Sequence, residues 1–345
     1  MIRLVRWLWE GEGITGWIVR VAFLPLAVVY RAVMWGREIA YRHGLVMTSS
    51  LPLRSISVGN LTVGGTGKTP VSAWLADWFL RHGARPAILL RGYGDDEPMV
   101  HARLVPKAVV QANPDRRAGA MAAARAGADL LVLDDAFQTL GIRRDLNLVL
   151  VAVEHLAYSP FPLPAGPWRE GWGGLGRADG IIVTRKRESA ESAAVLADRL
   201  AKRWPKTPVG IAHLAISGFE GLRSGQPLAG ETLAGRRLLA AAGIADPDSF
   251  AAQLRERAGK SGAVQLVTYQ DHHAYSDRDV AELLSAATTA DYVVVTEKDA
   301  VKLRSRWPAE AREPLVATLG VQWERGQEAF EALLSTLINS STPAI

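Results

Sequence analysis

The stretch "SVGNLTVGGTGKTP", residues 57–70, carries a lysine and a threonine behind three closely spaced glycines. A phosphate-binding loop needs inward-pointing backbone N–H groups, a Lys for the β/γ-phosphates and a hydroxyl for Mg²⁺, all at the start of a helix. The usual first glycine is replaced by Thr62, which requires only an ordinary φ at that position. A glycine-rich turn of purely structural role is the alternative. The pattern favours binding of ATP by Thr62, Val63, Gly64, Gly65, Thr66, Gly67, Lys68 and Thr69.

A second motif, "ADLLVLDDAFQ", places Asp134 and Asp135 directly after the apolar run Leu130–Leu133. In open α/β sheets, ligands bind at the carboxyl ends of the strands. Paired carboxylates beside a phosphate-binding loop attract a divalent cation. The sequence therefore predicts a Mg²⁺ site made by Thr69, Asp134 and Asp135.

Two further polar clusters follow apolar runs of strand type. "RGYGDDEPM" contains Asp95, Asp96 and Glu97 in a predicted loop, and "QDHHAY" contains Asp271, His272 and His273. A carboxylate that faces an imidazole can remove the proton of an attacking hydroxyl. A third cluster, "LPAGPWREG", puts Arg169 and Glu170 in a Pro/Gly loop, where they are candidate substrate contacts.

These motifs are spaced by alternating strand-like and helix-like segments beyond residue 50, which predicts an α/β fold. We expect a P-loop NTPase-like, mostly parallel sheet with helices on both faces. A Gly-rich stretch at 216–236 indicates a boundary. The predicted parts are an N-terminal amphipathic helix (1–45), a kinase domain (46–216) and a smaller α/β domain (217–345) that contributes the catalytic histidine and closes over the site.

The composition excludes several classes of site. The 345 residues include no cysteine, so disulfides, thiolate metal sites and cysteine nucleophiles are ruled out. The formal net charge is +5, and among the 40 basic residues Arg outnumbers Lys, with no dense basic run. The sequence therefore predicts no nucleic-acid partner, whereas an anionic membrane surface and phosphorylated substrates fit the charge.

The N-terminal segment is predicted to lie on a membrane. Glu10 and Glu12 interrupt its apolar stretch, which argues against a secretory signal. Its longest uncharged run, Val21–Tyr30, has 10 residues, against about 20 needed to cross a bilayer. At helical period, Ile18, Ala22, Leu26, Val29 and Val33 lie opposite a stripe of charged residues, and four tryptophans precede residue 36. The alternative is a helix packed on its own domain.

Taken in order, the motifs "SVGNLTVGGTGKTP", "RGYG", "DEP", "DDAFQ", "LPAGPWRE", "DHH.Y" and "TEKDAVKL" resemble those of the tetraacyldisaccharide 4′-kinases of lipid A biosynthesis. The resemblance runs from about residue 14 to the end. It implies transfer of the γ-phosphate of ATP, with Mg²⁺, to the 4′-hydroxyl of an acylated glucosamine disaccharide 1-phosphate, forming lipid IVA. It also implies a location at the cytoplasmic face of the bacterial inner membrane, peripheral or monotopic, with no obligate protein partner.

The resemblance also implies roles for individual residues. The catalytic pair falls on Asp96 and His272, with Lys68 as the catalytic lysine of the loop. Arg116, Gln138, Arg169 and Glu170 match positions that contact substrate. The chain departs from the family pattern at Thr139, where His is common, and at Ala136, where Gly is common. Its segment between "RGYG" and "DEP" is also shorter, because Gly94 runs straight into Asp95.

Two other classes of protein share part of this pattern. A membrane-associated P-loop switch or partition ATPase also combines an amphipathic helix with a Lys-Thr loop, but it activates a water rather than a sugar hydroxyl. A dinucleotide-binding oxidoreductase is disfavoured because no G-x-G-x-x-G follows the first strand. Dependence of ATP turnover on added acylated disaccharide separates the kinase from the switch.

Overall fold

A computed structural model describes residues 9, 14–92, 96–157 and 159–339. The chain divides into two compact units. The first unit contains residues 1–93, 101–213 and 321–345, and the second contains 94–100 and 214–320. The predicted C-terminal domain (217–345) therefore coincides with the second unit only over 217–320. The last helix, α10 (Gln327–Asn339), belongs to the first unit because Phe330 packs against Gly180 and Gly210 there.

The first unit is built on a parallel sheet in the order β7-β6-β5-β1-β4-β2-β3. Its strands are β1 (Arg54–Asn60), β2 (Pro86–Leu90), β3 (Val109–Ala112), β4 (Leu130–Asp134), β5 (Leu146–Ala152), β6 (Gly180–Arg185) and the start of β7 (Val209–Gly221). The central strands are apolar and almost fully buried, as expected for strands covered on both faces.

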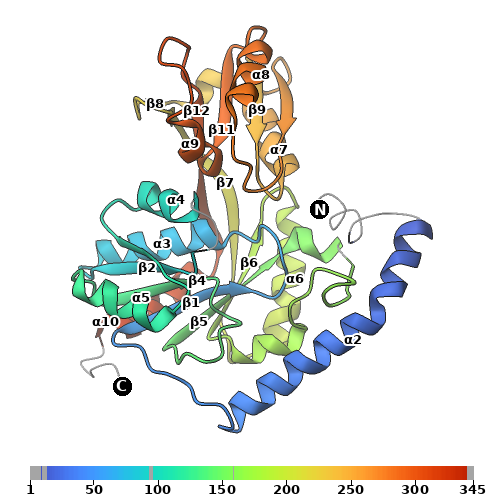
Figure 1. Cartoon of the computed structure of the whole chain (residues 1–345), viewed down its shortest axis with the longest axis vertical. Helices are drawn as coiled ribbons and strands as arrows, with labels where there is room; N and C mark the ends of the chain where they lie inside the picture. Colours follow the sequence, from blue (N-terminus) through green and yellow to red (C-terminus); the bar gives the residue numbers. More distant parts are fainter. Residues whose placement is uncertain (1–8, 10–13, 93–95, 158, 340–345) are drawn as a thin grey trace. The chain divides into compact units, whose positions relative to one another are not determined.

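Helices cover both faces of this sheet (Figure 1). On one face, α5 (Arg116–Arg125) packs against Leu89 and Leu131, and α6 (Ala190–Arg203) packs against Val149 and Ile181. The other face carries α10 and α3 (Lys68–Arg81), whose Trp74 contacts Trp323 at a ring-centroid distance of 5.3 Å. The first unit also contains the 3₁₀ turns η1 (Val153–Ala157) and η2 (Trp172–Arg177). Helix α4 (Asp96–Leu104) begins in the residues assigned to the second unit and ends in those of the first.

In the second unit the strands follow one another in the order β10-β9-β11-β12, and β9 pairs in parallel with β10 and β11, as β11 does with β12. Its helix α7 (Pro247–Ala258) covers one face through Phe250 and Leu254, while α8 (Asp277–Ala287) and α9 (Glu297–Leu303) cover the other. The strands are β9 (Arg237–Ala242), β10 (Ala263–Thr268), β11 (Tyr292–Thr296) and β12 (Leu315–Arg325), and a short β8 (Pro227–Leu228) pairs with the end of β7, ahead of the turn η3 (Gly230–Leu233).

The α/β fold class with a mostly parallel sheet is thereby confirmed. Several elements differ from the sequence predictions. Strand β7 continues through the start of the predicted boundary region to Gly221. Asp96 and Glu97 lie in the first turn of α4 and not in a loop, because acidic residues stabilise a helix N-terminus. Asp95 lies outside the described residues.

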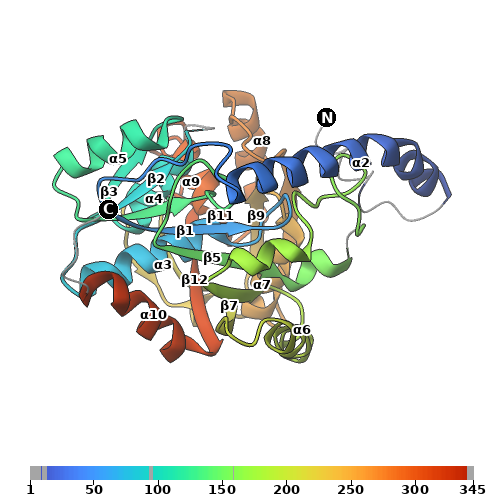
Figure 2. The ribbon, with the colours of Figure 1, turned by 90° about the horizontal axis from the view of Figure 1, so that it is seen from below.

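The N-terminal helix α2 (Ile14–Arg42) reverses the usual arrangement of an amphipathic helix on a globular protein. Its apolar residues Leu26, Val29 and Val33 are 56%, 59% and 62% exposed, whereas its polar residues Tyr30, Arg37 and Glu38 are hydrogen-bonded to the rest of the first unit. The helix is therefore held on its own unit through part of its polar side, while its apolar stripe stays exposed. By length and composition alone, Gly16–Arg42 could also cross a membrane, which the sequence prediction did not allow. In both ribbon views α2 projects past β1 and β5 of its unit (Figure 2).

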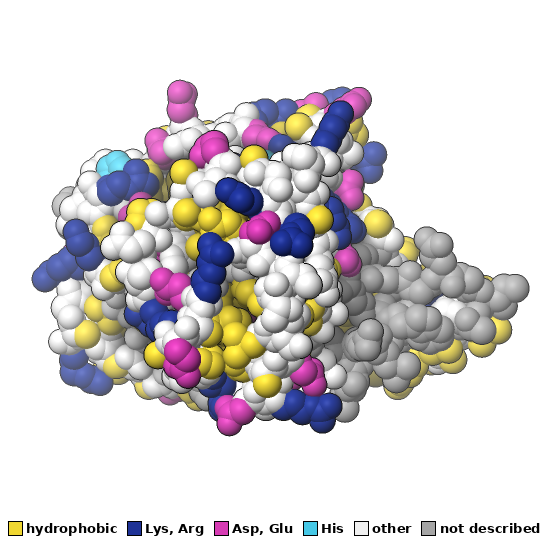
Figure 3. Space-filling model, turned by 90° about the horizontal axis from the view of Figure 1, so that it is seen from above, with side chains coloured by type: hydrophobic (Ala, Val, Ile, Leu, Met, Phe, Trp, Pro, Cys, Tyr) yellow, Lys and Arg dark blue, Asp and Glu magenta, His cyan; other side chains and the backbone are white. Residues whose placement is uncertain are grey.

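The polar side of α2 is held by hydrogen bonds to the first unit. Tyr30 Oη donates to the carbonyl of Arg169 (3.2 Å), and the Arg37 guanidinium donates to the carbonyl of Gln138 (3.0 Å). Glu38 accepts from Arg177 at 3.0 Å. Elsewhere, the face shown in Figure 3 carries acidic and basic side chains interspersed, so the positive net charge is not gathered there.

Candidate active site

The glycine-rich loop joins β1 to α3, as the sequence predicted. Gly64 and Gly67 have φ of 118° and 94°, which side chains with a Cβ rarely adopt, and α3 begins at Lys68. The loop is held in place by Thr66, whose buried hydroxyl accepts a hydrogen bond from Asn60 Nδ2 at 2.8 Å. The Thr184 hydroxyl donates to the Thr66 carbonyl at 2.9 Å. These contacts hold the loop N–H groups at the helix N-terminus, where an anion binds favourably.

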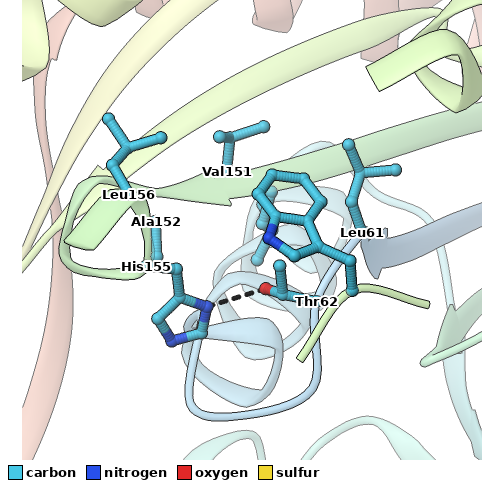
Figure 4. Close-up of a pocket in the computed structure, with 8 residues that line it drawn as sticks. Leu61, Thr62, Val151, Ala152, His155 and Leu156 are labelled. Atoms are coloured by element: carbon cyan, nitrogen blue, oxygen red, sulfur yellow. Dashed lines mark hydrogen bonds between the residues drawn. The ribbon is translucent and has the colours of Figure 1, made fainter. Parts of the chain in front are cut away.

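The start of the loop is supported by a histidine that the sequence did not indicate. Thr62 Oγ1 lies 2.7 Å from Nδ1 of His155, in a small hollow otherwise lined by apolar side chains and Trp168 (Figure 4). A Cβ on Gly64 would lie 3.2 Å from Cε1 of the same imidazole. Val63 N donates to the carbonyl of Pro167 at 2.8 Å. Thr62 thus replaces a glycine with a side chain that has a specific partner.

The two aspartates at the end of β4 differ in their surroundings. Asp134 is buried, and its Oδ2 lies 2.9 Å from Nε2 of His101 while Oδ1 has no hydrogen-bond partner among the described residues. Asp135 is partly exposed, with φ 50°, and its carboxylate lies 3.7 Å from Lys68 Nζ and 3.0 Å from Arg169.

The charge of Asp134 is stabilised despite its burial. Burial raises the pKa of this carboxyl, but the hydrogen bond and charge of His101 and the cations Lys68 and Arg116 outweigh it and lower the pKa overall. An ionised, buried carboxylate with one unpartnered oxygen is suited to accept a cation. No group of three or more His, Asp or Glu that could hold a metal occurs within the described part of the chain. The oxygen ligands that the sequence predicts for a hard cation are the aspartate pair and the Thr69 hydroxyl.

The second unit brings Asp96 and His272 together. His272 Nδ1 lies 3.0 Å from both carboxylate oxygens of Asp96, which is 6% exposed. Lys302 Nζ lies 3.0 Å from Asp96 Oδ2. Burial raises the pKa of Asp96, but hydrogen bonds from His272 and Lys302 outweigh it and hold that pKa well below its usual range. The hydrogen bond to Asp96 raises the pKa of His272, against an opposing effect of burial.

Known proteins resemble this chain over most of its length. A family model described as Tetraacyldisaccharide-1-P 4′-kinase matches residues 19–339. A protein of Pelobacter propionicus named tetraacyldisaccharide 4′-kinase is 34% identical over 93% of this chain and 89% of its own. One of Geobacter metallireducens with the same name is 38% identical over 83% of this chain and 89% of its own.

A solved structure agrees. The crystal structure of LpxK from Aquifex aeolicus in complex with ATP has a TM-score of 0.72 and 25% identity, covering 92% of this chain and 99% of that one. The chain belongs to the tetraacyldisaccharide-1-P 4′-kinase family. The predicted family and enzyme class, a kinase, are thereby confirmed, and the switch ATPase is not favoured.

The substrate residues that the 4′-kinase resemblance implies lie at the carboxyl edge of the first unit's sheet. Gln138 Nε2 donates to the carbonyl of Asn60 at 2.7 Å, and Arg169 donates to Asp135. Arg116 is buried, and it donates to the carbonyls of Leu89 (2.6 Å) and Asp134 (2.7 Å), joining the ends of β2 and β4. Contact of these residues with substrate stays a prediction.

One arginine that sequence reasoning missed ties this edge of the 4′-kinase to α2. Arg177 donates to Glu170 at 2.5 Å and to Glu38 at 3.0 Å, and its guanidinium lies 4.7 Å from the ring centroid of Phe137. Glu170 is therefore held by an ion pair and buried. No local motif marks Arg177, because its partners are 139 and 7 residues away in sequence.

Proposed function

We propose that the protein transfers the γ-phosphate of ATP to the 4′-hydroxyl of an acylated glucosamine disaccharide 1-phosphate. The observation that carries this proposal is the Gly-Lys-Thr loop opening α3 beside Asp134 and Asp135, in a chain of the 4′-kinase family. A bond forms between the 4′-oxygen and the γ-phosphorus, and the bond from that phosphorus to the β,γ-bridging oxygen breaks. ADP leaves, and the hydroxyl proton passes to the enzyme.

The loop and its lysine bind the phosphates of ATP. Backbone N–H groups of Gly65, Gly67 and Lys68 are available to the anion, and the Lys68 ammonium interacts more strongly as negative charge develops on the transferred group. Arg169 lies on the same carboxylate as Lys68, which brings a second cation to this edge. Asp135 holds both cations in reach of a bound phosphate.

Thr69, Asp134 and Asp135 would hold Mg²⁺. The donor set consists of oxygens, and the buried, unpartnered Oδ1 of Asp134 fits a hard cation. When bound, Mg²⁺ neutralises charge on the phosphate oxygens. His101 fixes Oδ2 of Asp134 and leaves Oδ1 for the cation or for one of its waters.

His272, oriented by Asp96, accepts the hydroxyl proton. A sugar hydroxyl is a poor nucleophile at neutral pH, so a positioned base contributes about 10²–10⁴-fold. Asp96 remains ionised because its pKa is held low, so it acts by orienting the imidazole through Nδ1. Nε2 of His272 is then the atom that gains the proton.

The apolar face of α2 binds the surface of the inner membrane on its cytoplasmic side. The occupant is a bilayer because the helix exposes a continuous apolar stripe, including Trp17 and Trp35 at 59% each, while its polar residues are hydrogen-bonded to the first unit. Those hydrogen bonds favour a helix that lies in the interface over one that crosses the bilayer. A substrate with four acyl chains stays in the membrane, so the kinase must reach it there.

The test of this function is a product assay. Purified full-length protein, ATP labelled in the γ-phosphate and acylated disaccharide 1-phosphate in mixed micelles should yield labelled lipid. Omission of Mg²⁺ should stop the reaction. The variant Asp134→Asn keeps the shape of the side chain but removes its charge, and it should require more Mg²⁺ for half-maximal rate. Hydrolysis of ATP at an equal rate without lipid would contradict the proposal.

A further inference from the structure

The motif "TEKDAVKL", residues 296–303, has no assigned role in the function proposed above, although its Lys302 contacts Asp96. In the structure it forms the end of β11 and the helix α9 of the second unit. The helix is fixed by Asp299, which is buried and accepts from Tyr275 Oη at 2.9 Å, from Gly243 N at 3.0 Å and from Thr296 Oγ1 at 2.6 Å. The backbone that carries the two lysines of this motif is therefore held in one position.

Both lysines point at the acidic start of α4. Lys302 Nζ lies 3.0 Å from Asp96 Oδ2, and Lys298 Nζ lies 3.9 Å from Glu97 Oε1. The Lys302 side chain is 16% exposed and Asp96 is 6% exposed, so this pair is poorly screened by water. His272 Nδ1 approaches the same carboxylate from the loop after β10. One buried carboxylate thus has two nitrogen partners.

We propose that Lys302 is a positioning residue for phosphoryl transfer, which fixes Asp96 and balances its charge so that His272 keeps a neutral, correctly oriented imidazole. This inference rests on the function proposed above, because it assigns Lys302 a role in that proton transfer. Lys302 itself does not contact the reacting atoms in this account.

Lys302 acts on His272 through its charge. A carboxylate beside an imidazole favours the imidazolium, which cannot accept a proton. The ammonium of Lys302 offsets the charge of Asp96 and weakens that effect. Within the described chain, the other charged groups that face His272 are Lys298, which opposes its protonation, and Asp271, whose Oδ2 lies 3.9 Å from Nε2 and favours it. Glu97 is engaged by Lys298.

Geometry gives Lys302 a second effect. Without the ammonium, Asp96 Oδ2 would lose a partner while remaining buried, so the carboxylate would turn toward His272 or toward water. The imidazole would then lose its fixed orientation. A rate loss from misplacement alone would leave the pH dependence unchanged, whereas loss of the charge balance would move it.

The experiment compares Lys302→Met, Lys302→Gln and Lys302→Arg with the wild-type full-length kinase over a range of pH. Removal of the charge should lower kcat by roughly 10- to 100-fold, a part of what a complete general base contributes. The acid limb of kcat/KM should move to higher pH by up to about one unit. KM for ATP should stay within about twofold, because Lys302 does not touch the phosphate loop in this account. Lys302→Arg should restore most of the rate and the wild-type limb.

The control is Lys260→Met, which removes an exposed lysine of the same unit and should change neither quantity. If the wild type is active and the acid limb of kcat/KM is unshifted in both Lys302→Met and Lys302→Gln, this inference is overturned. The proposed function would then still stand. A wild type that phosphorylates no acylated disaccharide would instead overturn the proposed function. Lys302→Gln keeps a hydrogen-bond donor toward Asp96, so it gives a folded test if Lys302→Met does not fold.

Discussion

Binding of α2 to a membrane can be predicted quantitatively from its exposed apolar face. Burying a full Leu or Val side chain is worth about 1.5–3 kcal/mol. Leu26, Val29 and Val33 expose 56%, 59% and 62% of their surface, so each should contribute about 1–1.5 kcal/mol on entering a bilayer. Replacing all three with Ser should therefore cost about 3–4 kcal/mol, which corresponds to roughly 10²–10³-fold weaker partitioning.

Sedimentation with vesicles of mixed zwitterionic and anionic lipid measures this partitioning. The matched control is Met121→Ser with Val195→Ser, because these side chains are also about half exposed (46% and 54%) but lie on α5 and α6. The triple variant should melt at the wild-type temperature, since its side chains make few contacts in the folded chain. Wild-type partitioning by the triple variant, or an equal loss in the control, would refute the assignment of this face to the membrane.

Three other predictions concern the site. Lys68→Ala should lower kcat by at least about 10²-fold at saturating ATP, because it removes charge that stabilises the transition state; near-normal turnover would rule out the phosphate-loop assignment. The pKa of His272 is raised from 6.5, and the imidazolium cannot accept a proton. The value of kcat/KM should therefore fall as the pH drops through that raised pKa, and His272→Gln should abolish this acid limb of the pH profile. Arg177→Met removes the cation paired with Glu170 and one that pairs with Glu38, which keeps Arg42. It should lower the free energy of unfolding in urea by about 1–3 kcal/mol, whereas Arg278→Met, at an exposed ion pair, should change nothing measurable.

The places of the glycine-rich loop before α3 and of the aspartate pair at the end of β4 could be predicted from sequence because each is a local pattern. Residues 57–70 contain the strand end, the turn and the helix start in one contiguous stretch, and Asp134 is the last residue of its strand. The physical requirement and the sequence signal therefore lie within a few residues of each other. The same holds for the alternation of strands and helices that indicated the fold class.

Partners that are distant in sequence left no such signal. His101 and Asp134 are 33 residues apart, and Thr62 and His155 are 93 apart. Lone histidines are usually satisfied polar groups, so neither could be assigned from its type. The amphipathic pattern of α2 identified its two faces but not which one turns outward. The hydrogen bonds of Tyr30 and Arg37 to carbonyls of the first unit show that the polar face turns inward.

The most direct test of the whole account is the transfer of labelled γ-phosphate from ATP to acylated disaccharide 1-phosphate by the purified full-length protein. One labelled lipid, phosphorylated at the 4′-position, should form in an amount equal to that of ADP. Neither product should form without the lipid substrate. ADP formation that is independent of the lipid, with no label in the lipid fraction, would contradict this account and indicate a nucleotide-driven switch instead.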